Sequence, residues 1–305
     1  MLIGNEGNYG LVTEAVVRLR PMPEVFEYES AVFPDFQHGT KFFEEVAKSR
    51  IWPASMRMFD NKQFQMSQAI KEQSTGIVMS TKEWLKHFYL TKIRGFDFDK
   101  LAACTIKFEG TREEVARQRK SITALVLKHN GIVAGAKSGE NGYIMTFAIA
   151  YVRDFGTDYC FIAESFETSV PWSQVPTLCQ RVRERMLDWT KSKGIEYDRI
   201  FLSFRVTQAY ETGAAVYIYF GFNYGYYKWT KEKALLTMEE IEIECREEVM
   251  RQGGSMSHHH GIGKMKKRFL KLAYPPQTNE LLNTIKNFYD PKNIFACNNT
   301  SYRTP

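Results

Sequence analysis

The sequence predicts an α+β fold in which helices cover one face of a largely antiparallel sheet. Two strand-helix-strand units follow one another along the chain, and a tandem of such units is typical of a duplicated ferredoxin-like arrangement. The second unit continues into two adjacent strands, which predicts antiparallel pairing. With 305 residues, 44% of them hydrophobic and 25% charged, the chain has the composition of a soluble globular protein and can bury a large core.

The first unit begins with an apolar strand at residues 102–108. A helix follows, and Thr111 with Glu114 has the Thr-x-x-Glu spacing of a capping box, in which each side chain binds a backbone N–H that the first helical turn leaves free. We expect this helix to end near residues 130–131. The apolar run at residues 143–152 then predicts a strand that is buried on both faces.

The second unit begins with a strand at residues 159–166, and Pro171 suits the first turn of the helix that follows. Apolar residues recur along this helix at spacings of three and four, which predicts one buried stripe. The stripe consists of Val175, Leu178, Val182, Met186 and Trp189. Gly194 is expected to end the helix, and strands are predicted at residues 200–207 and 214–222.

The last part of the chain combines helices with one irregular segment. A long helix is predicted at residues 231–252 and stops at Gly253-Gly254. Periodicity assigns residues 255–263 to neither a helix nor a strand, and a short amphipathic helix is predicted at residues 279–289. Because irregular segments with unusual chemistry often carry function, residues 255–263 are the first candidate for a functional site.

Composition limits the classes of function. The longest apolar stretches are about half as long as a bilayer-spanning helix requires, and the first residues lack the basic and apolar regions of a secretion signal. The five cysteines are too widely spaced for a disulfide framework or a zinc knuckle, which favours a reducing compartment. The net charge of +6 is modest, and we expect no nucleic-acid partner. One basic segment is expected to be a solvated helix face, with lipid head groups or a phosphate as its alternative ligands: Lys264, Lys266, Lys267, Arg268 and Lys271.

Three adjacent histidines, His258, His259 and His260, form the most unusual string in the sequence. Adjacent residues of a helix or strand cannot all face one point, so their convergence requires an irregular backbone. The glycines that allow it are Gly253, Gly254, Gly261 and Gly263. We predict no metal, because no carboxylate or cysteine is spaced here as a zinc ligand. Proton transfer and anion binding remain, since imidazole titrates near neutral pH.

A tyrosine and two arginines are further candidates. Tyr217 alternates with apolar residues in its strand, where it is either a packed aromatic ring or an acid/base group. Arg57 and Arg153 interrupt or end apolar stretches. Arginines in such places are usually paired, here with Asp60 or Asp154, and they also suit the binding of a carboxylate or phosphate.

Three glycines in the seven residues 4–10 precede a strand-like stretch at residues 11–19. Glycines at this density let the backbone approach a ligand closely and present N–H groups to it. A tight turn before a strand explains the same pattern. The glycines alone do not decide between these two interpretations.

Five strings together resemble a known family over nearly the whole chain. Residues 4–15 (Gly-Asn-Glu-Gly-Asn-Tyr-Gly-Leu-Val-Thr-Glu-Ala), followed by Arg20-Pro21, resemble the last flavin-contacting segment of the vanillyl-alcohol-oxidase type of FAD proteins. Residues 290–295 (Asp-Pro-Lys-Asn-Ile-Phe) resemble their closing motif. Three further strings narrow the resemblance to alkylglycerone-phosphate synthases. They are residues 53–57 (Pro-Ala-Ser-Met-Arg) with 60–64, residues 164–169 (Glu-Ser-Phe-Glu-Thr-Ser) with Pro171-Trp172, and residues 253–264, which contain the three histidines.

The resemblance implies a domain organisation and an activity. Residues 22–289 would form the substrate-binding cap domain of an FAD-linked oxidase, residues 1–21 the end of an FAD-binding domain, and residues 290–305 a closing segment that returns to it. The implied enzyme replaces the acyl group of acyl-dihydroxyacetone phosphate with a long-chain fatty alcohol. It uses FAD without net redox chemistry, and its product enters ether-lipid synthesis.

The resemblance also implies roles for individual residues. Tyr217 would be the acid/base, Arg153 would hold the acyl carboxylate, and Arg57 with the three histidines would shape the active site. The segment expected to contact FAD consists of Glu6, Gly7, Asn8, Tyr9, Gly10, Leu11 and Val12.

Partners and location are implied in the same way. Members of the family carry a separate FAD-binding domain ahead of the first glycine segment, so we expect this chain to be a carboxy-terminal part. Acyl-dihydroxyacetone phosphate and fatty alcohol as substrates, a peripheral membrane surface, a homodimer and a peroxisomal location are all expected, although the chain shows no peroxisomal address. Two alternatives stay open: a flavin-linked 2-hydroxy-acid dehydrogenase, and an inactive truncated cap that serves only in binding or dimerisation.

Overall fold

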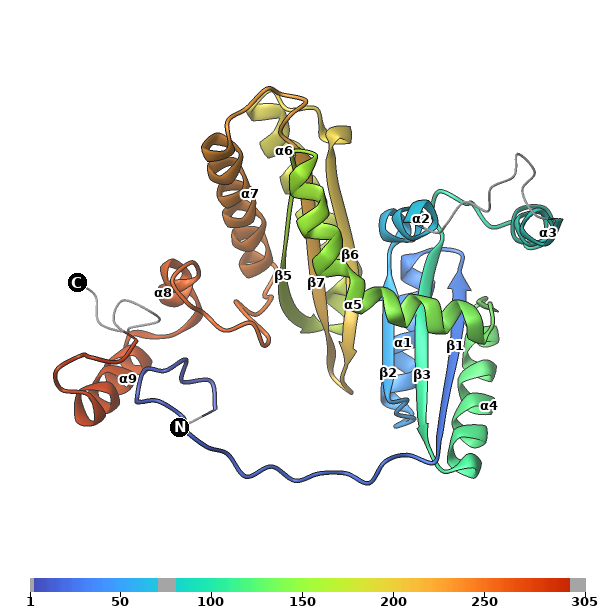
Figure 1. Cartoon of the computed structure of the whole chain (residues 1–305), viewed down its shortest axis with the longest axis horizontal. Coiled ribbons are helices and arrows are strands. Elements are labelled where there is room, and N and C mark those ends of the chain that lie inside the picture. The colour runs from blue at the N-terminus through green and yellow to red at the C-terminus, as the bar shows by residue number, and fades with distance from the viewer. Residues whose placement is uncertain (1–2, 71–80, 297–305) are drawn as a thin grey trace.

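The computed structural model describes residues 3–70 and 81–296, and the strands of these residues form one antiparallel sheet of seven strands (Figure 1). The order across the sheet is β4-β1-β3-β2-β6-β7-β5. The strands are β1 (Val25–Phe33), β2 (Ser55–Phe59), β3 (Ala102–Gly110), β4 (Ile132–Val133), β5 (Phe161–Pro171), β6 (Ile200–Ala209) and β7 (Gly213–Asn223). The predicted α+β class with a largely antiparallel sheet is confirmed.

Helices connect the strands in an order that divides the sheet into two similar halves. The helices are α1 (Phe36–Lys48), α2 (Asn61–Ile70), α3 (Thr81–Phe88), α4 (Arg112–Lys128), α5 (Ala136–Asp158), α6 (Val175–Ser192), α7 (Lys231–Arg251), α8 (Leu270–Ala273) and α9 (Pro276–Tyr289), with short turns at Tyr89–Ile93, Trp172–Gln174, Tyr197–Arg199 and Lys267–Phe269. Strands β1 to β4 with α1 and α4 have the order β4-β1-β3-β2, which is ferredoxin-like. Strands β5 to β7 with α6 and α7 repeat most of this unit, so a duplicated ferredoxin-like arrangement is present, but its first unit begins at β1 and not at residue 102 as predicted.

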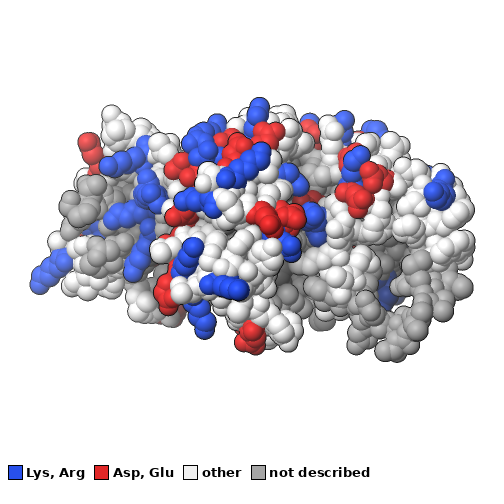
Figure 2. Space-filling model, turned by 90° about the horizontal axis from the view of Figure 1, so that it is seen from above, with Lys and Arg blue, Asp and Glu red and all other residues white. Residues whose placement is uncertain are grey.

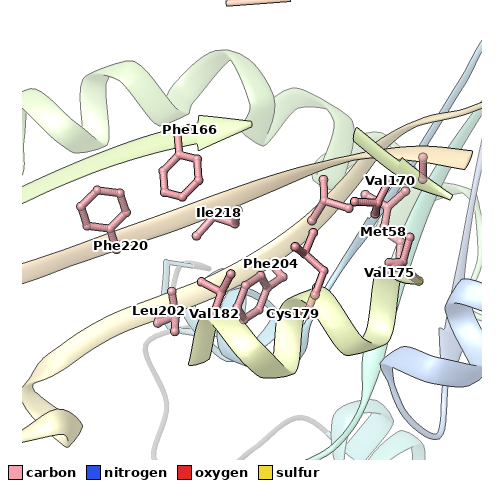
Figure 3. Close-up of a cluster of buried hydrophobic side chains, with 14 of the residues drawn as sticks. Met58, Phe166, Val170, Val175, Cys179, Val182, Leu202, Phe204, Ile218 and Phe220 are labelled. Atoms are coloured by element: carbon pink, nitrogen blue, oxygen red, sulfur yellow. The ribbon is translucent and has the colours of Figure 1, made fainter. Parts of the chain in front are cut away.

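The main core lies between the sheet and the layer formed by α1, α4, α6 and α7. The predicted stripe of α6 is buried along its whole length. Figure 3 shows Val175, Cys179 and Val182 of this helix facing Phe204 and Ile218 of the sheet. One boundary differs from the prediction, because Pro171 ends β5 and the proline in the first turn of α6 is the next one along the chain.

The capping box of α4 forms as predicted. The Thr111 hydroxyl accepts a hydrogen bond from the backbone N–H of Glu114, and the Glu114 carboxylate accepts one from the backbone N–H of Thr111. The helix buries Val115, Ile122 and Val126 in the core. Local chemistry therefore sets the start of this helix, and its apolar face sets where it packs.

The strand predicted at residues 143–152 is wrong, because these residues belong to helix α5. The short strand β4 closes the first half of the sheet instead. Helix α5 crosses the face of the sheet opposite to α1, α4, α6 and α7, in front of β2 and β3 in Figure 1, and Gly139 and Gly142 lie against the Glu29 backbone and the Thr105 side chain. Its outer side also carries large exposed apolar residues: Ile144, Phe147, Tyr151 and Phe155. A helix that is apolar on both sides has no helical periodicity, and for this reason the run looked like a buried strand.

The two ends of the described chain lie together beside the second half of the sheet (Figure 1). The Nζ of Lys286, in α9, is buried and donates to the carbonyl oxygens of Asn8, at 2.7 Å, and Phe295, at 2.8 Å. It also forms an ion pair with Asp290. The amino-terminal glycine segment and the closing motif are therefore held by one lysine.

The face of the molecule seen in Figure 2 is mixed in charge over much of its extent. Figure 2 shows acidic and basic residues interspersed over its middle, with Lys and Arg gathered towards the end where α8 and α9 lie. Among the described helices, none has the length and apolar character needed to cross a membrane.

We predict that Gly139→Ala destabilises the protein by about 1–3 kcal/mol, because overpacking displaces neighbouring groups. The added methyl carbon would lie 2.3 Å from the carbonyl oxygen of Glu29. Urea unfolding followed by circular dichroism measures the difference. The matched control is Ser138→Ala, at an exposed position of the same helix. Equal stabilities of the two variants would contradict the close packing of α5 on the sheet.

Candidate active site

The face of the sheet opposite the main core carries a row of polar side chains. Arg205 on β6 pairs with Tyr217 on β7, and Tyr217 pairs with Glu167 on β5. Residues that are directly opposite in neighbouring strands point to the same face, so these three side chains lie side by side. Their neighbours Val216 and Ile218 point the other way and belong to the core. Strand alternation thus separates a polar face from the face that packs in the core.

Glu167 holds the histidine segment on this face. Its carboxylate is completely buried and accepts hydrogen bonds from the Ser257 hydroxyl at 2.7 Å and from the backbone N–H groups of His258, His259, at 3.1 Å, and His260, at 2.9 Å. Four donors around one carboxylate require a tight, irregular turn. The flanking Gly253, Gly261 and Gly263 have φ angles of +74°, +77° and +56°, so the predicted irregular backbone is confirmed.

The three imidazole rings converge on two tyrosines. The Tyr217 hydroxyl lies 2.6 Å from Nε2 of His259 and 3.0 Å from Nε2 of His260. The Tyr210 hydroxyl lies 2.9 Å from Nε2 of His258. The Nδ1 atoms of His258 and His259 are 2.9 Å apart, so the rings also contact each other. The predicted acid/base tyrosine and the predicted histidines therefore form one connected network.

The pKa values in this network determine which of its groups carry a proton at neutral pH. Burial raises the pKa of Glu167, but hydrogen bonds from His260, Ser257, His258 and His259 outweigh it and lower that pKa to about 2. Burial, with the nearby Tyr219 and Glu167, raises the pKa of Tyr217 to about 12. Burial is also the largest cause that lowers the pKa of His260. At neutral pH the carboxylate is therefore charged, the phenol is protonated and the His260 imidazole is neutral.

Lys266 is a member of the site that the sequence did not indicate. It belongs to the basic segment predicted to be a solvated face, yet it is buried, whereas Lys264, Arg268 and Lys271 are exposed. Its Nζ donates to the Ser257 hydroxyl at 3.0 Å and to the carbonyl oxygen of Gly261 at 2.6 Å. Burial and the charge of nearby Arg246 lower the pKa of Lys266 to about 8. This buried lysine thus stabilises the histidine turn through two hydrogen bonds.

The sequence shows no carboxylate spaced as a metal ligand near the histidines, but the structure brings one there. A carboxylate does lie near the histidines, because β5 brings Glu167 within 4.8 Å of ligand atoms of His258 and His259. Its two oxygens already accept four hydrogen bonds from the turn. This arrangement favours a carboxylate that organises the turn.

A cavity of about 450 Å³ opens next to Tyr217, between the two halves of the sheet. It lies where β2 and β6 separate beyond their two paired positions, next to a register shift between Val206 and Gln208 in the pairing of β6 with β7. Arg57 from β2 and Arg205 from β6 line it together with Tyr217. Arg57 thus lies at this cavity, and Arg205 was missed because a single arginine in an alternating strand has no sequence signal.

The partners suggested for the two predicted arginines differ in outcome. Asp60 forms an ion pair with Arg183 at 3.7 Å and accepts hydrogen bonds from the Ser203 hydroxyl and the Phe204 backbone. Arg57 lies instead over the ring of Tyr143 on α5, at 5.4 Å. Arg153 is exposed on α5 with Asp154 at 3.8 Å, and it does not line the cavity. The position predicted for Arg153, at the end of a strand, is therefore wrong.

The amino-terminal glycine segment reaches the histidine segment. The Glu6 carboxylate accepts hydrogen bonds from the backbone N–H groups of Ile262, at 2.6 Å, and Gly263, at 2.8 Å. Asn8 is buried, and its Oδ1 has no hydrogen-bond partner among the described residues. Gly10 has open space where a side chain would be. An acceptor without a donor beside an approachable backbone fits one wall of a site for a ring with N–H groups, as a flavin has.

We predict that Glu167→Gln destabilises the chain by about 2–4 kcal/mol at pH 7, because an amide replaces a charged acceptor of four hydrogen bonds. The folded-state pKa of about 2 lies below the ordinary value of 4.5. The contribution is therefore complete above pH 4.5 and is lost as the pH falls towards 2.

Urea unfolding of wild type and Glu167→Gln at a series of pH values between 7 and 3 measures this effect. The control is Glu164→Gln, at an exposed position of the same strand. A gap between wild type and Glu167→Gln that does not shrink on acidification would contradict the role of the carboxylate.

Comparisons with known proteins agree with this geometry. Residues 22–299 match the family described as FAD linked oxidases, C-terminal domain. An alkyldihydroxyacetonephosphate synthase of Caenorhabditis elegans is 42% identical over 98% of this chain and 49% of its own length. One of Dictyostelium discoideum is 26% identical over 98% of this chain and 47% of its own length.

A solved structure of an alkyldihydroxyacetonephosphate synthase has a similar fold. Its TM-score is 0.73 at 24% identity, covering 95% of this chain and 48% of that one. The chain thus spans about half the length of the curated relatives and of the solved synthase described here. With a family match over most of its residues, the chain belongs to the family of FAD linked oxidases, C-terminal domain.

Proposed function

We propose that this chain provides the substrate-binding part of a flavin-dependent alkylglycerone-phosphate synthase. The reaction exchanges the acyl group of acyl-dihydroxyacetone phosphate for a fatty alcohol, and it releases the fatty acid. The observation that carries the proposal is the Tyr217 hydroxyl held between His259 and His260. The similarity to two named synthases over 98% of the chain supports the same activity.

Tyr217 and the histidines are suited to move one proton in this exchange. The alcohol must lose a proton when it forms the ether bond, and the departing acid is stabilised by an acidic partner. With its raised pKa, Tyr217 is protonated at neutral pH and can donate. The lowered pKa of His260 leaves its imidazole neutral, so it can take up a proton through the tyrosine hydroxyl. Glu167 keeps both rings in place.

The cofactor of the proposal is FAD. When bound, FAD would supply the nucleophilic nitrogen for the exchange. The segment from Glu6 to Val12 would line one side of its site through the open backbone at Gly10 and the unpaired oxygen of Asn8. Arg153 is proposed to hold the acyl carboxylate, by resemblance alone. Residues 1–21, 22–289 and 290–305 are proposed as the three parts of the chain on the same ground.

Partners and location extend the proposal. Substrates with long acyl and alkyl chains partition into bilayers, so a peripheral membrane surface suits this chemistry. A homodimer and a peroxisomal location follow the resemblance to the synthases. The proposed reaction does not depend on the membrane surface, the homodimer or the location.

The first test is the visible absorption spectrum of the chain after incubation with FAD and removal of free ligand. The proposal expects a retained flavin band, followed by formation of labelled alkyl-dihydroxyacetone phosphate from labelled fatty alcohol. Bleaching of the flavin by a 2-hydroxy acid without exchange would favour the dehydrogenase. Absence of both FAD and exchange would leave the chain as a binding module and contradict the proposal for this chain.

We predict that Tyr217→Phe lowers the exchange rate by about 10²–10⁴-fold, the usual contribution of a positioned acid/base group. The substitution removes the hydroxyl and keeps the ring, so the flavin band should be unchanged. The matched control is Tyr226→Phe, at an exposed position of the loop after β7. A Tyr217→Phe rate within twofold of wild type would contradict the acid/base role.

A further inference from the structure

The cavity next to Tyr217 has an unusual charge distribution. The described residues that line it include Arg57 and Arg205 with their guanidinium groups, and none of these lining residues is Asp or Glu. Burial and the charge of Arg205 lower the pKa of Arg57, so the two cations are close enough to repel each other. Like charges in a partly buried place are unfavourable unless an anion joins them.

Arg205 differs from other buried arginines of this protein. It is 6% exposed, its Nε has no hydrogen-bond partner among the described residues, and it forms no ion pair with their carboxylates. Arg246, which is 5% exposed, binds Glu242 through Nε and Nη2 and the Met256 carbonyl oxygen through Nη1. Buried arginines are ordinarily paired in this way. The unused donor of Arg205 therefore needs an acceptor from outside the described chain.

The acidic residue of the polar row already uses its carboxylate for other hydrogen bonds. Glu167 lies on the far side of Tyr217 from Arg205, two strands away, and its carboxylate accepts four hydrogen bonds from the histidine turn. It cannot turn towards the cavity without breaking that turn. The cavity itself falls in the usual size range of small-molecule sites, roughly 300–1,000 Å³.

We propose that Arg57 and Arg205 form the binding site for a phosphate monoester, the phosphate group of the dihydroxyacetone-phosphate substrate. A phosphate monoester carries about −1.5 to −2 charges at pH 7, which matches two guanidinium groups better than a single carboxylate does. Planar guanidinium donors also fit phosphate oxygens in pairs. The identity of the substrate rests on the proposed function, whereas the recognition of phosphate rests on the cavity.

The location of this site determines in which direction the substrate would lie along the polar face. Tyr217 lines the same cavity as both arginines and contacts the histidines beyond it. A phosphate bound between the arginines would place the carbon chain of the substrate towards the Tyr217 hydroxyl. The phosphate is thus the anchor, and the proton-moving groups lie on the side where the reacting carbon must be.

The test measures phosphate binding without FAD or turnover, so it is independent of the transferase reaction. Isothermal titration of the chain with inorganic phosphate and with glycerol 3-phosphate is carried out at constant ionic strength set with chloride. Acetate serves as a carboxylate competitor. We expect both phosphates to bind and to raise the melting temperature, and acetate to bind more weakly.

Substitutions of the two arginines test whether they form the binding site. Arg205→Gln and Arg57→Gln should each weaken phosphate binding by about 10- to 100-fold, the contribution of a charge-assisted hydrogen bond. Arg205→Lys keeps the charge without the planar donors and should lie between them and wild type. The matched control is Arg181→Gln, at an exposed position of α6 where the arginine pairs with Glu184, and it should bind like wild type. If Arg205→Gln does not fold by circular dichroism, Arg57→Gln and Arg205→Lys decide.

The inference would be overturned if the wild type did not bind phosphate, if the folded arginine variants bound it unchanged, or if acetate bound as tightly as phosphate. Binding only to phosphate borne on phosphatidate vesicles would also overturn it, because the site would then be for a lipid head group. Arginine-dependent phosphate binding without transferase activity would leave this site intact and count against the proposed function alone.

Discussion

The seven-stranded sheet depends on a short junction between β2 and β6. The two halves pair there only through Met58 with Val206 and Phe59 with Arg205. Asp60 strengthens the junction, since its carboxylate accepts hydrogen bonds from the Ser203 hydroxyl at 2.7 Å and the Phe204 backbone at 3.0 Å. Beyond these pairs the two strands separate, and the cavity opens at the edge of the junction. A longer junction would close the space in which we propose that substrate binds.

On the polar face, the buried charge of Glu167 has the most consequences. A carboxylate that accepts four hydrogen bonds stays ionised well below neutral pH, so the turn of three histidines is formed before any ligand arrives. Preorganised donors and acceptors cost no rearrangement at the moment of reaction. The same turn receives Glu6 from the amino-terminal segment, which links the proposed flavin wall to the proposed acid/base group through two backbone hydrogen bonds.

The division of the sheet into two faces explains why one layer could be predicted and the other could not. Helices α1, α4, α6 and α7 bury apolar stripes against one face and leave polar residues outside. Helix α5 covers part of the polar face and has apolar residues on its outer side as well, including Phe147 and Tyr151. Apolar residues on both sides of residues 143–152 removed the periodicity by which helices are recognised, and the position assigned to Arg153 was lost with it.

The sequence by itself determined the local parts of this protein: the capping box at Thr111, the buried stripe of α6 and the irregular glycine-rich turn with its three histidines. Each of these follows from residues within a few positions of one another, where backbone geometry fixes the spacing. Only the tertiary structure decided that Glu167 holds the histidine turn, that Lys266 is buried beneath it and that Arg205 shares a cavity with Arg57. Those residues meet through strand pairing and packing between segments far apart in the chain, and single polar residues carry no periodicity that announces such a meeting.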